Sequence, residues 1–144
     1  METQSYANHT QIVPPFHRVL LPILLLTVIG SLVNLYLSWG DHERLYNASL
    51  IVVLSIGILG VALFSRMFAL RAQDRAIRAE ESLRHFVLTG KLPDTRLTIR
   101  QIIALRFAPD GEFAPLAKKA ADESMTPDAI KQAIKQWRAD TYRA

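Results

Sequence analysis

The chain has 144 residues and a net charge of +4; half of its residues are hydrophobic and 21% are charged. Its lack of cysteine excludes a disulfide framework, a zinc–thiolate site and a catalytic cysteine, and its six glycines and seven prolines exclude a collagen-like chain. Residues 1–65 carry a net charge of −1 and residues 66–144 a net charge of +5, so the sequence predicts two parts of different character.

The first hydrophobic segment, residues 19–37, contains nineteen residues without an ionisable side chain. As a helix it would be roughly 28 Å long, which matches a bilayer core of about 30 Å. We therefore predict a membrane span at about residues 18–38, after an N-terminal segment 1–17, with a slight kink at Pro22. A cleaved signal peptide is not favoured, because residues 1–17 contain no Lys or Arg.

A second uncharged segment of nineteen residues, 47–65, follows a short connection at residues 39–46. A connection of this length allows only an antiparallel return, so residues 18–65 are predicted to form a transmembrane helical hairpin. Two buried helices of a soluble domain are not favoured, because the rest of the chain is too short to cover both.

The orientation of the hairpin is predicted from basic residues near the ends of the spans. Arg66, Arg71, Arg75, Arg78 and Arg84 follow the second span, whereas the connection contains only Arg44. The positive-inside rule therefore predicts that both termini are cytoplasmic, at the inner membrane of a cell.

The spans also contain small or weakly polar residues, which predict helix packing within the membrane: Thr27, Gly30, Ser31 and Asn34 in the first span, and Gly57 and Gly60 in the second. The alternative is that this stripe lines a path for a substrate or ion, as in a small transporter or permease-accessory subunit. Neither span contains an ionisable residue, the usual marker of such a path.

Residues 66–90 are predicted to continue the second span as an amphipathic helix that stops at Gly90 and Pro93. One face is apolar, with Ala69, Ala72, Ala76, Ala79, Leu83, Phe86 and Val87. Arg66, Arg71, Arg75 and Arg78 are predicted to contact lipid head groups, at about 1 kcal/mol each. Two predicted ion pairs have the i, i+4 spacing: Asp74 with Arg78, and Glu80 with Arg84. His85 is predicted to face a helix interface or to pair with Glu81.

Residues 91–144 are predicted to form a small cytoplasmic domain of three helices, with no strand. Thr98 and Gln101 have the spacing of a capping box, and a second helix that starts at about Glu112 accommodates Pro115. Thr126 and Pro127 begin the third, in which four residues share a face: Ile130, Ala133, Ile134 and Trp137.

No motif indicates catalysis, a cofactor or a metal, and the four histidines are too dispersed to meet. Trp137 and Tyr142 are candidates for contact with a protein partner. Residues 97–138 bear a loose likeness to a helix-turn-helix, with Lys131, Lys135 and Arg138 on its second helix, so a membrane-tethered nucleic-acid binder is a further alternative.

Three segments carry a resemblance to a known family: residues 6–10 (YANHT), 71–80 (RAQDRAIRAE) and 134–140 (IKQWRAD). In these segments the chain resembles an uncharacterised family of small bacterial two-span membrane proteins, a domain of unknown function. The resemblance implies a bacterial inner-membrane protein and transfers no catalytic residue, because the family has no assigned activity.

Together these features predict an all-α, non-enzymatic membrane adaptor. Its hairpin would anchor the long helix, which would present the cytoplasmic domain to a protein partner or to further copies of the chain.

Overall fold

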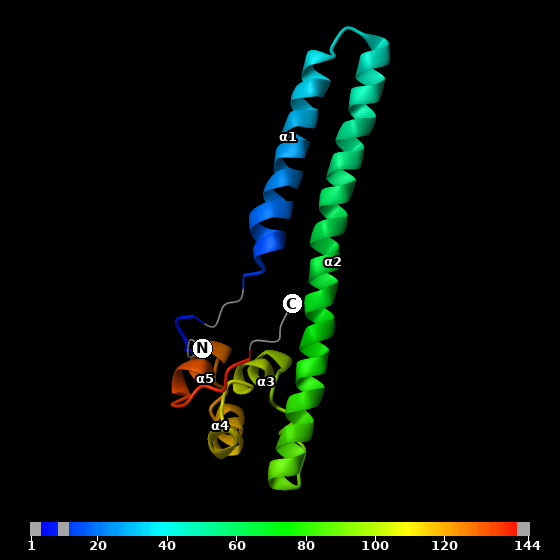
Figure 1. Cartoon of the computed structure of the whole chain (residues 1–144). Helices are drawn as coiled ribbons and strands as arrows, with labels where there is room; N and C mark the ends of the chain where they lie inside the picture. The colour runs from blue at the N-terminus through cyan, green and yellow to red at the C-terminus, as the bar shows by residue number, and fades with distance from the viewer. Residues whose placement is uncertain (1–3, 9–11, 141–144) are drawn as a thin grey trace. The chain divides into compact units, whose positions relative to one another are not determined.

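The computed structural model describes residues 4–8 and 12–140, which form helices and no strand (Figure 1). A π-helical segment, η1 (Pro15–Leu20), leads into α1 (Leu21–Leu37), and a long helix, α2 (His42–Thr89), follows. Three short helices complete the chain: α3 (Ile99–Leu105), α4 (Asp110–Asp122) and α5 (Pro127–Ala133). The predicted all-α class is therefore confirmed.

The chain divides into two compact units, and α2 contributes to both. One unit is Ile12–Ala69; the other combines Met1–Gln11 with Leu70–Ala144. The long helix ends at Thr89, and the next residue, Gly90, has a φ of +71°, which glycine adopts without strain.

In the unit Ile12–Ala69, α1 and the first part of α2 are joined by the turn at residues 38–41 (Figure 1). This turn is shorter than the predicted connection at residues 39–46, because α2 already begins at His42. Asp41 caps the start of α2. Its carboxylate accepts a hydrogen bond from the Arg44 backbone N–H at 3.2 Å, and its backbone carbonyl accepts one from the Leu45 N–H at 2.8 Å. Gly40, with a φ of +99°, allows the reversal.

The residues withdrawn from the surface of this unit repeat every three or four positions along both helices, which is the spacing of a helix–helix seam. They include Leu21, Leu24, Val28, Ser31 and Leu35 in α1, and Leu45, Ala48, Val52, Ser55, Leu59 and Ala62 in α2. The two serines satisfy their own hydroxyls, since Ser31 donates to the Val28 carbonyl at 2.8 Å and Ser55 to the Ile51 carbonyl at 2.7 Å.

The second unit has a conventional hydrophobic core shared by α3, α4 and α5. Its largest fully buried side chains are those of Leu105, Phe107, Phe113 and Ile130, each of which stabilises the fold by about 1.5 to 3 kcal/mol. The predicted capping box is present, because Thr98 Oγ1 accepts from the Gln101 N–H while the Gln101 side chain accepts from the Thr98 N–H at 2.7 Å.

Two predicted helix boundaries in this unit are wrong. Helix α4 begins at Asp110 rather than near Glu112, because the Pro109 carbonyl already accepts from the Glu112 and Phe113 N–H groups at 3.0 and 2.9 Å. Pro115 consequently lies inside the helix and frees the carbonyl of the exposed Gly111.

Helix α5 ends at Ala133, so Ile134 and Trp137 do not belong to it. Ile134 is extended and Lys135 and Gln136 form a bend, after which no regular element follows up to residue 140. The Glu112 carboxylate accepts from the backbone N–H groups of Lys135 at 3.0 Å and Gln136 at 3.3 Å. These bonds to a charged acceptor compete with another helical turn.

Candidate functional site

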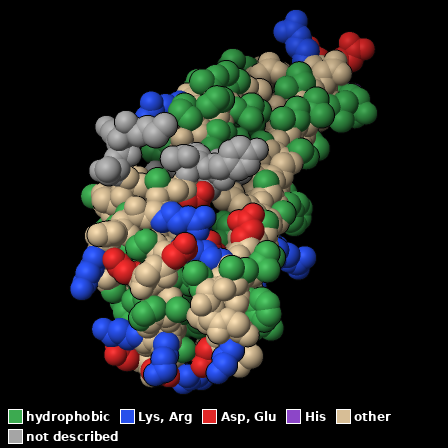
Figure 2. Space-filling model, turned by 60° about the horizontal axis from the view of Figure 1, so that its bottom comes forward, with side chains coloured by type: hydrophobic (Ala, Val, Ile, Leu, Met, Phe, Trp, Pro, Cys, Tyr) green, Lys and Arg blue, Asp and Glu red, His purple; other side chains and the backbone are tan. Residues whose placement is uncertain are grey.

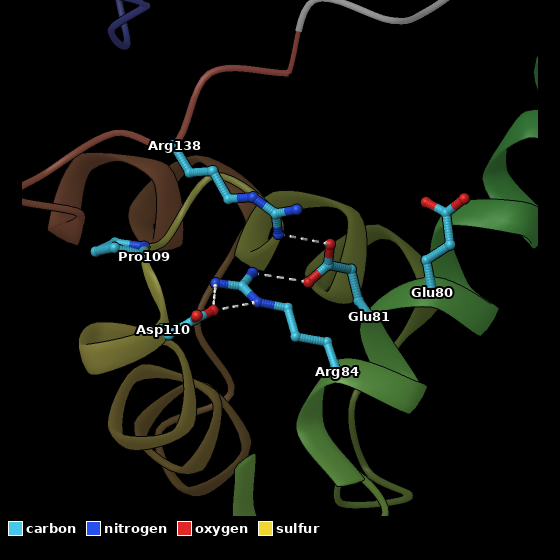
Figure 3. A pocket seen from close by; sticks show the side chains of 6 residues that line it. All are labelled: Glu80, Glu81, Arg84, Pro109, Asp110 and Arg138. Carbon is cyan, nitrogen blue, oxygen red and sulfur yellow. Dashed lines mark hydrogen bonds and ion pairs between the residues drawn. The ribbon is translucent and has the colours of Figure 1, made fainter. Parts of the chain in front are cut away.

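A group of charged side chains lies where the end of α2 meets the start of α4, within the second unit. It surrounds an open hollow of about 600 Å³ that is lined by Glu80, Glu81, Arg84, Pro109, Asp110 and Arg138 (Figure 3). Figure 3 shows that Arg84, Asp110 and Arg138 point toward Glu81 or toward one another, whereas the Glu80 carboxylate points away from them.

Arg84 is the centre of this cluster. Its Nη1 donates to Glu81 Oε2 at 3.0 Å, its Nε to Asp110 Oδ1 at 2.8 Å, and its Nη2 to the Ala108 carbonyl at 2.8 Å. The guanidinium also lies 4.5 Å from the centre of the Phe113 ring, a cation–π distance. One side chain of α2 therefore holds the loop before α4 and the first turns of that helix.

Glu81 supplies the buried negative charge, with a side chain that is 8% exposed, against 12% for Arg84. Arg138, in the segment after α5, places its Nη1 3.6 Å from the second Glu81 oxygen. Four of these charged residues face an opposite charge, so their geometry is that of a clamp between chain segments: Glu81, Arg84, Asp110 and Arg138.

The segment after α5 is fixed at further points. The Arg138 N–H donates to the Phe107 carbonyl at 2.7 Å, and the Arg106 Nε lies 3.0 Å from the Asp140 carboxylate. The Asp140 N–H donates to Gln4 Oε1 at 2.8 Å. The segment that precedes the first hydrophobic helix is thereby joined to the other end of the second unit.

A second ion cluster lies on the surface, where Arg96 Nη2 contacts Asp94 at 2.7 Å and Asp122 at 2.8 Å. Hydrogen bonding to the Arg96 guanidinium lowers the pKa of Asp94 to about 2 and also lowers the pKa of Asp122. The same bonds, first of all that with Asp94, raise the pKa of Arg96. Both carboxyl groups thus stay ionised and cannot act as proton donors near neutral pH.

His85 makes the first of its two predicted contacts, that with another helix, and no pair with Glu81 is formed within the described residues. Its Nδ1 lies 2.8 Å from the Lys91 carbonyl, which can only accept, and its ring packs edge-on against Phe113 at 5.9 Å. Within residues 4–8 and 12–140, no three His, Asp or Glu side chains gather at a place that could hold a metal ion.

Comparison with known families covers the chain completely: the model of a family of unknown function, DUF6526, matches residues 1–144. The chain belongs to this family. No curated protein and no solved structure matches it. The sequence resemblance predicted a family of unknown function, and this prediction is confirmed. The family has no assigned activity or site residue that could be transferred to this chain.

The small-residue stripe predicted in this DUF6526 chain is divided between two surfaces. Ser31 lies in the seam between α1 and α2, but Thr27, Gly30 and Asn34 are exposed, and a Cβ added to Gly30 would meet nothing within 4 Å. In α2, Gly60 is half-buried and Gly57 exposed. The prediction assumed one face at positions i, i+3, i+4 and i+7, whereas the seam passes through Val28, Ser31 and Leu35.

The arginines predicted to contact lipid lie on the outside of α2. Arg71, Arg75 and Arg78 are exposed, while Arg66 is half-buried with its guanidinium 5.2 Å from the Phe16 ring centre. In the part of the chain that the structure describes, neither predicted ion pair, Asp74–Arg78 or Glu80–Arg84, is formed. Arg84 turns toward Glu81 and Asp110 instead of Glu80.

The two aromatic residues predicted to contact a partner have different outcomes. Trp137 is half-buried against the core, with its ring centre 4.8 Å from that of Phe107, so it serves the fold. Tyr142 lies outside the described residues. The basic surface of a recognition helix is also not formed, because α5 ends before Lys135 and Arg138, and Arg138 pairs with Glu81.

Two residues of the clamp, Asp110 and Arg138, could not be selected from the sequence, and neither could Glu112. Glu81 and Arg84 are three positions apart, which indicates a local pair, but no pattern brings Asp110 or Arg138 to them. Glu112, which holds the segment after α5, has an equally ordinary position in the first turn of α4.

Proposed function

We propose that this protein is a non-enzymatic membrane adaptor, with two spans at about residues 18–38 and 47–65 and a cytoplasmic helical domain after them. The observation that carries the proposal is the inverted burial of the unit Ile12–Ala69. Leu26 and Val53 are 67% and 69% exposed, whereas Ser31 and Ser55 are 5% and 6% exposed. In lipid this arrangement is favourable, because small polar residues mediate helix contact and large apolar ones face the acyl chains.

Two further observations support insertion rather than a soluble core. Both helices are long and apolar enough to cross a bilayer, and only 6% and 17% of their most apolar windows are buried. Figure 2 shows hydrophobic side chains gathered on the rod of α1 and α2, while charged ones are interspersed over the other unit. An exposed apolar surface of this size would cause aggregation in water.

The contact between Gln4 and Asp140 supports a hairpin with both flanking segments on one side of the membrane. The segment before the first span and the segment after α5 belong to the same compact unit, so an even number of spans must separate them. The arginines behind the second span support a cytoplasmic location for this side, in line with the positive-inside rule. Exposed Arg71, which lies nearest the end of the second span, is then available to anionic head groups, and Arg75 and Arg78 lie progressively farther along α2 from the bilayer.

The proposal includes no catalytic role, because the clustered charged groups of the second unit form ion pairs with one another. Glu81, Arg84, Asp110 and Arg138 hold chain segments together, and the Asp94–Arg96–Asp122 cluster keeps its acids ionised. What the cytoplasmic unit offers instead is surface for binding, either to a protein partner or to another copy of the chain.

The transporter alternative gains no specific support. Thr27, Gly30 and Asn34 point away from the seam between α1 and α2, so they cannot line a path within one copy.

Single cysteines test the topology directly, because the chain contains none. Glu43→Cys marks the start of α2, between the two spans, and Thr95→Cys marks the loop between α2 and α3. A membrane-impermeant maleimide should label Glu43→Cys on intact cells, and Thr95→Cys only after permeabilisation. Labelling of Thr95→Cys on intact cells, or release of the chain from membranes by alkaline carbonate, would overturn the proposal.

A further inference from the structure

The last turns of α2 expose an apolar face that nothing in the chain's described residues covers. Leu83 and Val87 are 63% and 74% exposed, and Phe86, one turn along from Leu83, is also exposed. Exposed alanines continue this face toward the first unit at Ala69, Ala72, Ala76 and Ala79. We call the residues of this face from Ala69 to Phe86 the α2 seam, which is distinct from the seam between α1 and α2.

The α2 seam lies on a different side of α2 from the residues that pack on its own unit. At 100° per residue, the centre of Ile77, Glu81 and Arg84 is about 135° away from the centre of Ala76, Ala79 and Leu83. Ile77 and Glu81 are buried, and Arg84 holds the loop before α4. The helices of the same copy therefore occupy one side of α2 and leave the seam accessible.

The spacing of the seam is that of a coiled coil. Ala69, Ala76 and Leu83 are seven residues apart, and Ala72, Ala79 and Phe86 form a second series three residues later. These are the a and d positions of three consecutive heptads, the pattern by which two helices interlock along their length. The side of α2 that carries Ile77 and Glu81 already packs on its own unit. The heptad face is therefore a separate apolar face of the same helix.

We infer that the α2 seam binds the α2 seam of a second copy of this chain in a parallel, two-stranded coiled coil. The inference rests on the proposed function, because two copies anchored in one membrane with the same orientation must present α2 in parallel. Large side chains at Leu83 and Phe86 would supply most of the contact, and the alanines would allow the helices to approach closely.

Charge complementarity supports the parallel arrangement. Arg75 is the g position of one heptad and Glu80 the e position of the next, and g and e positions of facing helices are neighbours in a parallel coiled coil. Both side chains are exposed, neither has an ion-pair partner within residues 4–8 and 12–140, and Figure 3 shows Glu80 turned away from the Arg84 cluster. A dimer would contain this Arg75–Glu80 pair twice.

Lipid is a poor occupant for the same face. Leu83 and Phe86 lie seventeen and twenty residues beyond Arg66 on one helix, which is roughly 25 to 30 Å. A helix tilted by about 20° still carries both residues well past the head groups. Attachment to a shared membrane also raises the effective concentration of the two seams, so a short interface is sufficient.

Disulfide cross-linking of the full-length chain in native membranes tests the inference. Ala76→Cys and Ala79→Cys place a thiol in the seam, and Arg78→Cys is the matched control, one position from Ala79 but outside the seam. Mild oxidation should produce a band of twice the chain mass with both seam variants and not with the control. Equal cross-linking of all three would indicate random collision and overturn the inference.

A charge exchange then tests the register. In the Ala79→Cys background, Arg75→Glu or Glu80→Arg alone places like charges across the interface and should reduce the dimer band several-fold, whereas both together should restore it. Failure of the double exchange to restore the band would overturn the parallel pairing. Membrane retention is measured in parallel: a retained chain without cross-links contradicts only the dimer, and a chain lost from the membrane contradicts the proposed function.

Discussion

The Arg84 guanidinium of α2 and the Glu81 carboxylate one turn before it form a nearly buried ion pair at 3.0 Å, and Arg84 continues from there to Asp110 and the Ala108 carbonyl. A local pair on one helix thus becomes the attachment of that helix to the α3–α4 loop. Buried pairs of this kind are sensitive to loss of one partner, because the remaining charge keeps its desolvation cost.

Replacement of Arg84 by Met should therefore destabilise the second unit by about 3 kcal/mol. Glu80→Gln, on the adjacent residue whose carboxylate points away from the cluster, should change stability by less than about 0.5 kcal/mol. Thermal unfolding of the full chain in detergent, with Trp39 replaced by Phe so that Trp137 is the only tryptophan, measures both. Equal stability of the two variants would show that the clamp contributes little.

A second prediction concerns Glu112, whose carboxylate accepts from the Lys135 and Gln136 N–H groups. Glu112→Ala should release the segment after α5 and accelerate hydrogen exchange at these two amides by at least about tenfold, since bonds to a charged acceptor contribute roughly 1.5 to 3 kcal/mol. Glu123→Ala, at the other end of α4, is the control and should leave their exchange unchanged.

How much of the structure can be predicted from the sequence depends on whether the interactions that determine it are local in the sequence. The two hydrophobic helices, the stop at Gly90 and the capping box at Thr98 follow from run length, backbone freedom and hydrogen bonding over three or four residues, and they were predicted from the sequence. The α5 boundary was not, because the Glu112 carboxylate that accepts from the chain after Ile134 lies more than twenty residues away. The Glu81–Arg84–Asp110–Arg138 clamp has the same long-range origin.

Acid should act on the surface cluster of Asp94, Arg96 and Asp122. Because Arg96 lowers the pKa of Asp94 from 3.8 to about 2, the unfolded chain binds more protons than the folded one between these values. This stabilisation is complete above about pH 4 and is lost as the pH falls through about 2. Asp94→Asn should make the dependence of unfolding on pH shallower between pH 4 and 2, whereas Asp128→Asn should not; identical slopes would contradict the assignment.

Packing between α1 and α2 gives a prediction for the hydrophobic unit. Ala48 is 1% exposed, so Ala48→Leu should overpack the seam and cost about 1 to 3 kcal/mol. Asn34→Leu, on the exposed side of α1, should be tolerated. Loss of helical circular dichroism on heating in detergent distinguishes the two, and a more sensitive Asn34 variant would place the seam on the wrong face of α1.

Trp137 allows the fold and partner binding to be separated. Its ring lies 4.8 Å from that of Phe107 at the edge of the core, so Trp137→Ala should cost about 3 kcal/mol, while Trp137→Phe should retain most of the ring contact. Because the alanine variant loosens the whole unit, any loss of binding that it causes is an indirect effect. The phenylalanine variant is the informative one: if cross-linking through the α2 seam persists in it, Trp137 acts within its own copy and the seam alone is the surface that meets the second.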